Sequence, residues 1–174
     1  MAAQTVRITG TAQLLALHNR LRRADQARVA ALLLRRVRRA AEPLQRDMRQ
    51  TIRGLPIRPD PRKAGSRGGP SPTTRPLRAT IAQAVRLSVR TTNPVGARIW
   101  IDRSTLPSDL MNMPWVLNSP NGRIRHPTFG RKGRGGWVNQ WTTPLWWDKT
   151  VRTHTPRMTA EVERVLNDVR RLVS

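Results

Sequence analysis

Cysteine is absent from this sequence of 174 residues, which excludes disulfide bridges and thiolate metal sites. Long apolar runs are also missing: the longest, such as Ala30 to Leu34, fall well short of the roughly 18 residues that a membrane span requires. The N-terminal segment MAAQTVRITG has no apolar signal core. We therefore expect neither secretion by that route nor contact with a membrane.

Acidic residues are scarce, with 10 Asp and Glu against 33 Lys and Arg, and the formal net charge is +23. A lone compact monomer with this charge would repel itself, so the composition indicates an anionic partner. Arginine greatly outnumbers lysine, and its planar guanidinium pairs with phosphate in a fork that lysine cannot reproduce. The sequence has no zinc finger, heptad zipper or other recognition motif, so any nucleic-acid contact is expected to be independent of base sequence. DNA and acidic proteins both remain open as partners.

Residues that could carry catalysis or bind a metal ion are few. The three histidines, His18, His126 and His154, have neither metal-ligand spacing nor a nearby pair of carboxylates. The acidic residues form no cluster that would hold magnesium. A glycine-rich loop at 130–136 lacks the Lys-Ser or Lys-Thr ending and the preceding strand of a nucleotide-binding loop. We expect no catalytic site, no metal, no cofactor and no enzymatic activity.

Hydrophobic periodicity predicts three helices in a single α+β domain. Leucines at helical spacing predict a short first helix from Ala12 to Leu21. A stripe of aliphatic residues from Asp25 to Arg53 predicts a long amphipathic helix. Because the stripe keeps its phase across Pro43, we predict one kinked helix and not two separate ones. A closing helix is predicted from Thr155 to Val173.

The pattern changes to strict alternation between about residues 84 and 102, after a short helix predicted at Leu77 to Gln83. Aliphatic residues alternate there with polar ones on both sides of a turn at 92–96, which predicts a β-hairpin. The apolar face of the hairpin needs cover, and the long helix is the expected cover. Residues 104–121 are expected to be loop-like.

The segment from Gly54 to Pro76 is rich in proline and basic residues and has almost nothing apolar after Ile57. It cannot bury enough surface to offset its own ordering entropy, so we expect a mobile arm or loop. A linker without function and an arm that orders on a partner or on nucleic acid both remain open. In the second case the basic residues of the arm would make the contact: Arg58, Arg62, Lys63 and Arg67.

The stretch from Arg125 to Trp147, RHPTFGRKGRGGWVNQWTTPLWW, contains the only Phe and four of the six Trp. Because helix formers are rare in it, we expect irregular backbone that a few aromatic residues hold in place. For the rings, core anchoring and interface contact are favoured over base stacking, which usually comes with a recognisable sheet or channel. The expected interface or loop anchors are His126, Phe129, Trp137, Trp141, Trp146 and Trp147.

The order of elements and three short motifs carry a resemblance to a known family. The motifs are His126-Pro127-Thr128-Phe129-Gly130, then Trp137-Val138-Asn139-Gln140, then Pro144-Leu145-Trp146-Trp147. Together they resemble the small tail-completion or neck proteins of tailed bacteriophages, especially those of actinobacterial phages. The resemblance covers the chain from about Leu14 to Val173, with a longer basic loop at 131–136 than the family would lead us to expect.

The resemblance implies a structural virion protein at the head-to-tail junction, present in the host cytoplasm during assembly. It implies a ring, six- or twelve-fold, around the channel through which DNA leaves the capsid, with connector, stopper, tail-terminator or tail-tube proteins as neighbours. Within such a ring we expect Arg131, Lys132 and Arg134 to face the lumen, where they could contact double-stranded DNA non-specifically, or to face the adjacent ring. The alternative is a free-standing basic nucleic-acid-binding protein without sequence specificity.

Overall fold

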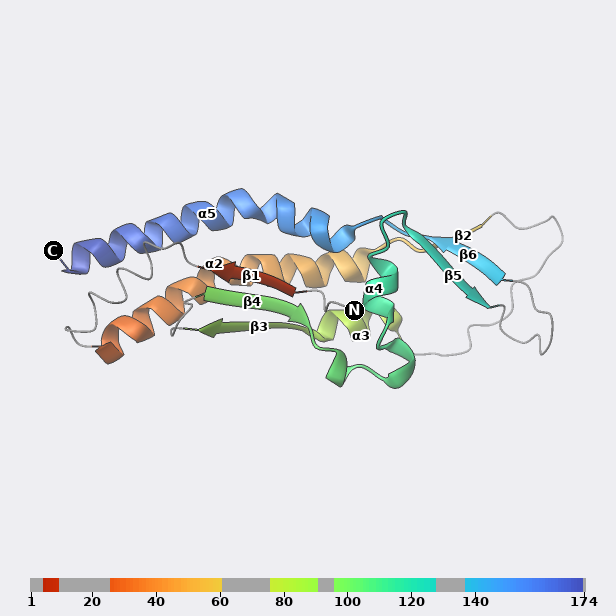
Figure 1. Cartoon of the computed structure of the whole chain (residues 1–174), viewed down its shortest axis with the longest axis horizontal. Coiled ribbons are helices and arrows are strands. Elements are labelled where there is room, and N and C mark those ends of the chain that lie inside the picture. Colours follow the sequence, from red (N-terminus) through yellow and green to blue (C-terminus); the bar gives the residue numbers. More distant parts are fainter. Residues whose placement is uncertain (1–4, 10–25, 61–75, 91–95, 128–136, 174) are drawn as a thin grey trace.

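The computed structural model describes residues 5–9, 26–60, 76–90, 96–127 and 137–173 and has an α+β architecture (Figure 1). Two long helices, α2 and α5, lie side by side along most of the molecule, with a three-stranded antiparallel sheet beneath them. A second three-stranded antiparallel sheet projects beyond one end of this body. The predicted fold class is thus confirmed.

Helix α2 spans Gln26–Gly54 and continues through Pro43, which confirms the single long helix expected from the sequence. Figure 1 shows that the helix bends along its length. Its apolar stripe returns every three or four residues to the same face, as a helix requires. That face supplies much of the core through residues that are almost fully buried: Leu33, Val37, Ala41, Leu44, Met48 and Ile52.

Helix α5 spans Trp146–Val173 and runs antiparallel to α2 (Figure 1). An ion pair joins Arg36 to Asp168, and His154 Nε2 lies 2.8 Å from Asp47 Oδ2 between the two helices. The prediction that this helix begins at Thr155 was wrong, because the helical backbone starts at Trp146 and continues through Pro156.

The cap of α5 comes from a distant segment of the chain. Asn118 Oδ1 accepts a hydrogen bond from the backbone N–H of Trp147, 2.9 Å away, and Asn118 Nδ2 donates to Asp148 Oδ2. Such a cap satisfies an N–H group that the first turn of a helix leaves free. A local sequence pattern cannot reveal it.

The sheet beneath the helices has the strand order β1–β4–β3, with β1 at Thr5–Thr9, β4 at Gly96–Ile101 and β3 at Val85–Arg90. Helix α3, Leu77–Gln83, leads directly into β3. The predicted hairpin and the predicted short helix before it are both confirmed. The long helix α2 contacts β3 and β4, as expected, while the third strand, β1, was not foreseen.

The connection after β4 contains the two short 3-10 helices Arg103–Thr105 and Ser108–Leu110 and then α4 at Met113–Leu117. The expectation of a loop at 104–121 was therefore only partly correct. Leu106, Leu110 and Leu117 are buried in the main core, which explains why this segment has regular structure.

The projecting sheet has the strand order β2–β6–β5, with β2 at Arg58–Pro59, β6 at Trp137–Trp141 and β5 at Arg123–Pro127. The expectation of irregular backbone was wrong for β5 and β6, which pair in antiparallel register. The predicted start of the arm at Gly54 was also wrong, because Leu55 is buried and Arg58 pairs with Trp141.

Several predicted features lie outside the described residues. These are the first helix at 12–21, most of the basic arm with Arg62, Lys63 and Arg67, and the loop with Phe129, Arg131, Lys132 and Arg134.

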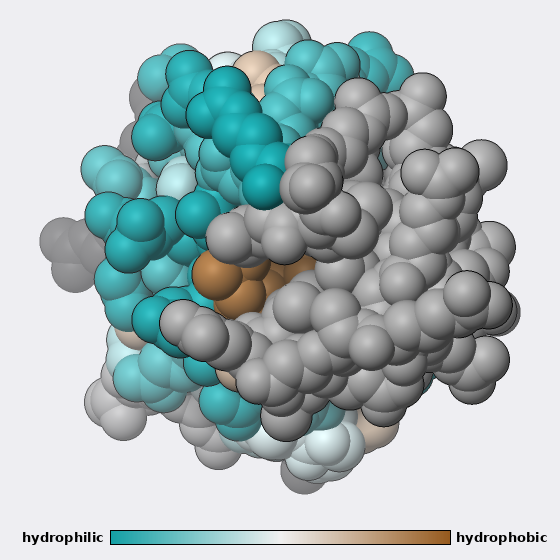
Figure 2. All heavy atoms as spheres, turned by 90° about the vertical axis from the view of Figure 1, so that its left-hand side faces the viewer, coloured by the Kyte–Doolittle hydropathy of each residue, from teal (hydrophilic) through white to brown (hydrophobic). Residues whose placement is uncertain are grey.

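At the end where α2 begins and α5 ends, the described surface is mainly hydrophilic (Figure 2).

Candidate docking face on the projecting sheet

The register of the projecting sheet gathers arginine and tryptophan on one of its faces. Arg58, Trp141 and Arg123 form one row across the three strands. Residues two positions apart on a strand share a face, so the next row on that face pairs Asn139 with Arg125. We call this surface the Trp–Arg face; with Asp60 at the end of β2, it comprises Arg58, Asp60, Arg123, Arg125, Trp137, Asn139 and Trp141.

The large side chains of this sheet lie on its solvent side. Trp137 and Trp141 are 57% and 43% exposed, whereas Ile124, on the opposite face, is only 3% exposed and belongs to the main core. Val138 and Gln140 on that opposite face are half-buried. Exposed aromatic residues grouped on one face are unusual on a monomer and mark surfaces that meet another molecule.

A hydrogen-bond network joins four residues of the Trp–Arg face to one another. The Asp60 carboxylate accepts a bond from Trp141 Nε1 and another from Asn139 Nδ2 at 3.0 Å. Asn139 Oδ1 in turn accepts a bond from Arg123 Nε at 2.9 Å. The ring of Trp141 and the guanidinium of Arg123 are therefore both positioned before any partner arrives, which reduces the ordering cost of binding.

The same network lowers the pKa of Asp60. The hydrogen bond from Trp141 is the largest cause, the bond from Asn139 is the next, and the nearby charge of Arg123 adds to them. All three favour the carboxylate over the neutral acid. Asp60 therefore remains charged through the neutral and mildly acidic range.

The second tryptophan of the face is held by a cation–π contact. The guanidinium carbon of Arg125 lies 4.9 Å from the centroid of the Trp137 ring. Such contacts orient the ring and leave its other face available. The face carries three guanidinium groups, those of Arg58, Arg123 and Arg125, and one carboxylate, that of Asp60. Its net charge is therefore 3 − 1 = +2.

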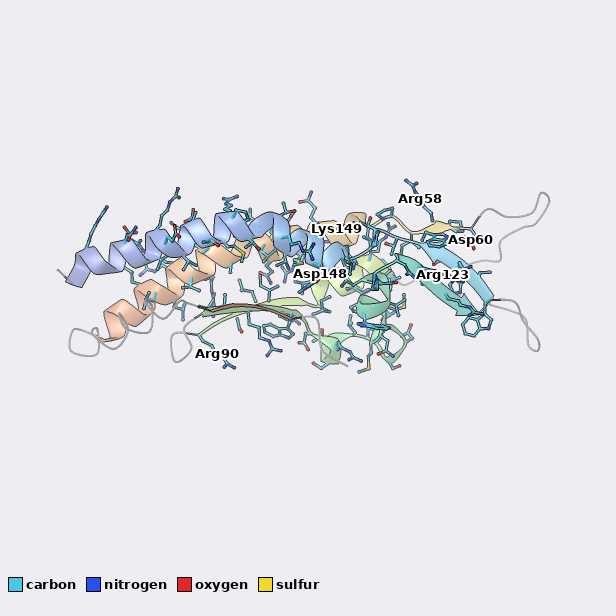
Figure 3. The ribbon with its side chains drawn as sticks, turned by 45° about the horizontal axis from the view of Figure 1, so that its top comes forward. Arg58, Asp60, Arg90, Arg123, Asp148 and Lys149 are labelled. Atoms are coloured by element: carbon cyan, nitrogen blue, oxygen red, sulfur yellow. The ribbon has the colours of Figure 1, made fainter. Side chains whose placement is uncertain are left out.

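Figure 3 shows Arg58, Asp60 and Arg123 together at this end of the molecule, away from Asp148 and Lys149 at the start of α5. Of the predicted contact residues, the structure thus brings Arg58, Trp137 and Trp141 onto one surface. It does not make Trp137 and Trp141 buried anchors, because their rings face solvent.

Trp146 and Trp147 lie elsewhere, in the main core. Both are almost fully buried, and their ring centroids are 5.7 Å apart in an edge-to-face arrangement. His126 is half-buried on strand β5 and has interactions of its own. Sequence reasoning missed Asp60, Arg123, Arg125 and Asn139 as members of the face, because the sequence of Trp137–Trp141 does not alternate strictly between apolar and polar residues.

A cleft of about 390 Å³ opens beside the junction of α2 and α5. It is lined by Asp47, Thr51, Lys149 and Thr150, among other residues. Within the described ranges, no three His, Cys, Asp or Glu side chains come together in a way that could hold a metal ion. No helix in the same part of the chain is both long and apolar enough to cross a membrane.

Comparisons with known proteins add no identification: no protein-family model, no curated protein and no solved structure matches this chain.

Proposed function

We propose that the protein is a structural component of the head-to-tail junction of a tailed bacteriophage, a neck or tail-completion protein that forms a ring around the DNA channel. The observation that carries the proposal is the Trp–Arg face, an exposed and preorganised surface on a sheet that projects from the body. Parts of two of the three motifs that resemble the neck family lie in the same sheet, since His126 is in β5, and Trp137, Asn139 and Gln140 are in β6. The third motif ends in Trp146 and Trp147, which belong to the main core.

A ring repeats one head-to-tail contact, so each subunit needs two different complementary surfaces. The projecting sheet is our candidate for one of them. The flank of α2, which runs along the body away from that sheet, is our candidate for the other (Figure 1). Trp and Arg are the residues most enriched at the energetic centres of interfaces, which supports a docking role for the sheet.

The charge of the chain fits this placement. A net charge of +23 on each subunit would be multiplied around a ring, and it would be balanced by DNA in the channel or by acidic rings above and below. The net charge of +2 on the Trp–Arg face likewise favours an acidic docking partner.

Native mass spectrometry of the full chain tests the ring. We expect an assembly of six or twelve copies, as the resemblance implies. The double substitution Trp137→Ala and Trp141→Ala should weaken assembly by on the order of 30-fold or more, which corresponds to the loss of a hot spot of about 2 kcal/mol. Trp115→Ala is the matched control, because Trp115 is 61% exposed but lies on α4, outside the projecting sheet.

Two results would count against the proposal. One is a chain that stays monomeric at every concentration and still binds DNA, which would favour the free-standing nucleic-acid-binding alternative. The other is equal weakening by the double substitution and by Trp115→Ala, since that would remove the special role of the Trp–Arg face. The genes on either side offer an independent check: capsid genes on one side and tail genes on the other are expected.

A further inference from the structure

A second arginine-rich surface lies on the outer face of the β1–β4–β3 sheet. Along β4 the aliphatic residues Ala97, Ile99 and Ile101 are buried, while the residues between them point the other way. The register sets Arg86 opposite Trp100 and Ser88 opposite Arg98, with Arg90 further along β3. We call this surface the outer arginine face; it comprises Arg86, Ser88, Arg90, Arg98 and Trp100.

We infer that the outer arginine face binds the phosphate backbone of double-stranded DNA without reading its sequence. This inference rests on the proposed function in naming the part of the described chain that would face the channel, but the contact itself requires only the folded chain.

The spacing of the arginines suits a line of phosphates. Arg86 and Arg90 are four residues apart on one strand, which separates them by about 13 Å, and Arg98 lies on the neighbouring strand between them. Each DNA strand carries one phosphate about every 3.4 Å along the axis, so such a row spans several phosphates. Figure 3 shows Arg90 extending away from the helical layer, where a long rod could approach.

The positive charge on this face is poorly neutralised by the protein. Asp102 lies 3.7 Å from Arg86, and its carboxylate also accepts hydrogen bonds from the backbone and hydroxyl of Ser104. Within the described part of the chain, no carboxylate forms an ion pair with Arg90 or Arg98. The Nε of Arg98 is moreover buried without a hydrogen-bond acceptor among the described residues. An anion at this face would supply the missing counter-charge.

The face is rigid because the reverse side of the sheet belongs to the core. Val85 and Ile99 are fully buried there, and α2 packs on both strands. Arg98 is also stacked on Trp100, with its guanidinium carbon 5.0 Å from the ring centroid. Charges held on a firm scaffold lose less entropy when they meet an extended anion.

The Trp–Arg face carries charge too, but its chemistry differs. Arg123 is held by Asn139, Arg125 stacks on Trp137, and two large rings dominate the surface. That composition is typical of a protein interface, whereas the outer arginine face has one half-buried tryptophan and three arginines. We therefore assign phosphate to the outer arginine face and protein docking to the Trp–Arg face.

The test compares two triple variants of the full chain that remove the same charge. The first is Arg86→Gln, Arg90→Gln and Arg98→Gln; the matched control is Arg58→Gln, Arg123→Gln and Arg125→Gln. Each is titrated by fluorescence anisotropy with a short mixed-sequence DNA duplex across roughly 50 to 200 mM salt. The magnitude of the negative slope of log affinity against log salt concentration should decrease by about 2 to 3 for the first variant and by less than about 1 for the control.

A third variant separates contact from folding. In the variant Arg86→Lys, Arg90→Lys and Arg98→Lys, most of the salt slope should be kept, because counterion release depends mainly on charge. Three outcomes would overturn the inference: equal slopes for both glutamine variants, which would mean binding by overall charge alone; a larger fall for the control; or a first variant that changes assembly mass without changing the slope. Ring formation is measured separately, so either proposal can fail while the other stands.

Discussion

The two three-stranded sheets of this protein carry similar residues in opposite arrangements. The Trp–Arg face and the outer arginine face as defined above each have three arginines, one aspartate next to them and one arginine stacked on a tryptophan. In β1–β4–β3 the bulky aliphatic residues point into the core. In β2–β6–β5 the two tryptophans point to solvent, and mainly Ile124 reaches the core from the other side.

The difference shows that arginine content alone does not determine the character of a sheet surface. How the reverse face of the sheet packs against the core also matters. The sheet under α2 gains its stability from burial, so its outer residues contribute little to the core and could carry the proposed phosphate contact. The projecting sheet buries little and depends on hydrogen bonds among Asp60, Asn139 and Trp141. Its two large rings stay exposed, as the proposed docking role requires.

The largest contrast should come from the cores of the two sheets. Ile99→Ala removes a fully buried side chain from β4 and should lower the free energy of unfolding by about 3 kcal/mol. Val138→Ala, on the half-buried face of β6, should cost less than about 1 kcal/mol. Urea denaturation followed by circular dichroism measures both. Equal costs would mean that the projecting sheet is packed as firmly as the other.

A smaller effect is expected at the base of the projecting sheet, where Gly122 precedes β5. Its φ of +68° favours glycine, and a Cβ there would lie 2.3 Å from the carbonyl oxygen of Thr142. Gly122→Ala should therefore cost roughly 2 kcal/mol and speed amide exchange in β5 and β6 more than in β3 and β4.

Gly54→Ala is the control for that substitution. Gly54 ends α2, and an added Cβ would meet nothing within 4 Å. The change should be neutral or stabilise the protein by up to about 1 kcal/mol, since alanine favours the helix over glycine. If Gly54→Ala lowered the free energy of unfolding more than Gly122→Ala, the close approach of Gly122 to Thr142 would not be important for the stability of the projecting sheet.

The smallest effect is a pH dependence confined to the projecting sheet. Because the pKa of Asp60 is lowered in the folded protein, its charged form adds stability that is complete above the unfolded pKa of about 3.9 and is lost as pH falls through the folded value. The indole N–H resonance of Trp141 should therefore change in acid, below about pH 4, before the amides of β3 and β4 do.

Asp60→Asn should remove most of this pH dependence while keeping a hydrogen-bond acceptor for the Trp141 indole. Nuclear magnetic resonance titrations of both proteins make the comparison. An unchanged titration of the Trp141 resonance in the variant would show that another group is responsible.

The hairpin and the long helix could be predicted because their signals are local. Aliphatic residues occupy every second position in β3 and β4, and the stripe of α2 keeps its phase across Pro43. In both cases the bulky residues point inward, as a pattern search assumes. The apolar face of β3 and β4 is therefore the face that packs against α2.

The projecting sheet could not be predicted in the same way, because its pattern is inverted. Trp137 and Trp141 lie on the solvent face of β6, while the smaller Val138 points to the other side. A pattern search assumes that the large apolar residues of a strand point into the core, so it does not detect a strand here. Strand β2 has only two residues, and Asp60 next to it is fixed by partners 79 and 81 positions away. Such contacts leave no local trace.

The start of α5 and strand β1 were missed for related reasons. The first turn of α5 is capped by Asn118 from a remote segment, and the helix continues through Pro156. Strand β1 pairs with β4 across most of the chain, from Thr5 to Trp100. Five residues without a neighbouring partner give too short a pattern to indicate a strand.

Both edge strands of the projecting sheet contain a proline, Pro59 in β2 and Pro127 in β5. Proline has no N–H to donate, so a strand from another molecule cannot complete a regular ladder along either edge. An edge with a complete row of free N–H groups would put separate copies of a chain at risk of joining sheet to sheet into open-ended fibres. The two prolines thus disfavour edge-to-edge pairing of the projecting sheet, which the proposed docking through its face also requires.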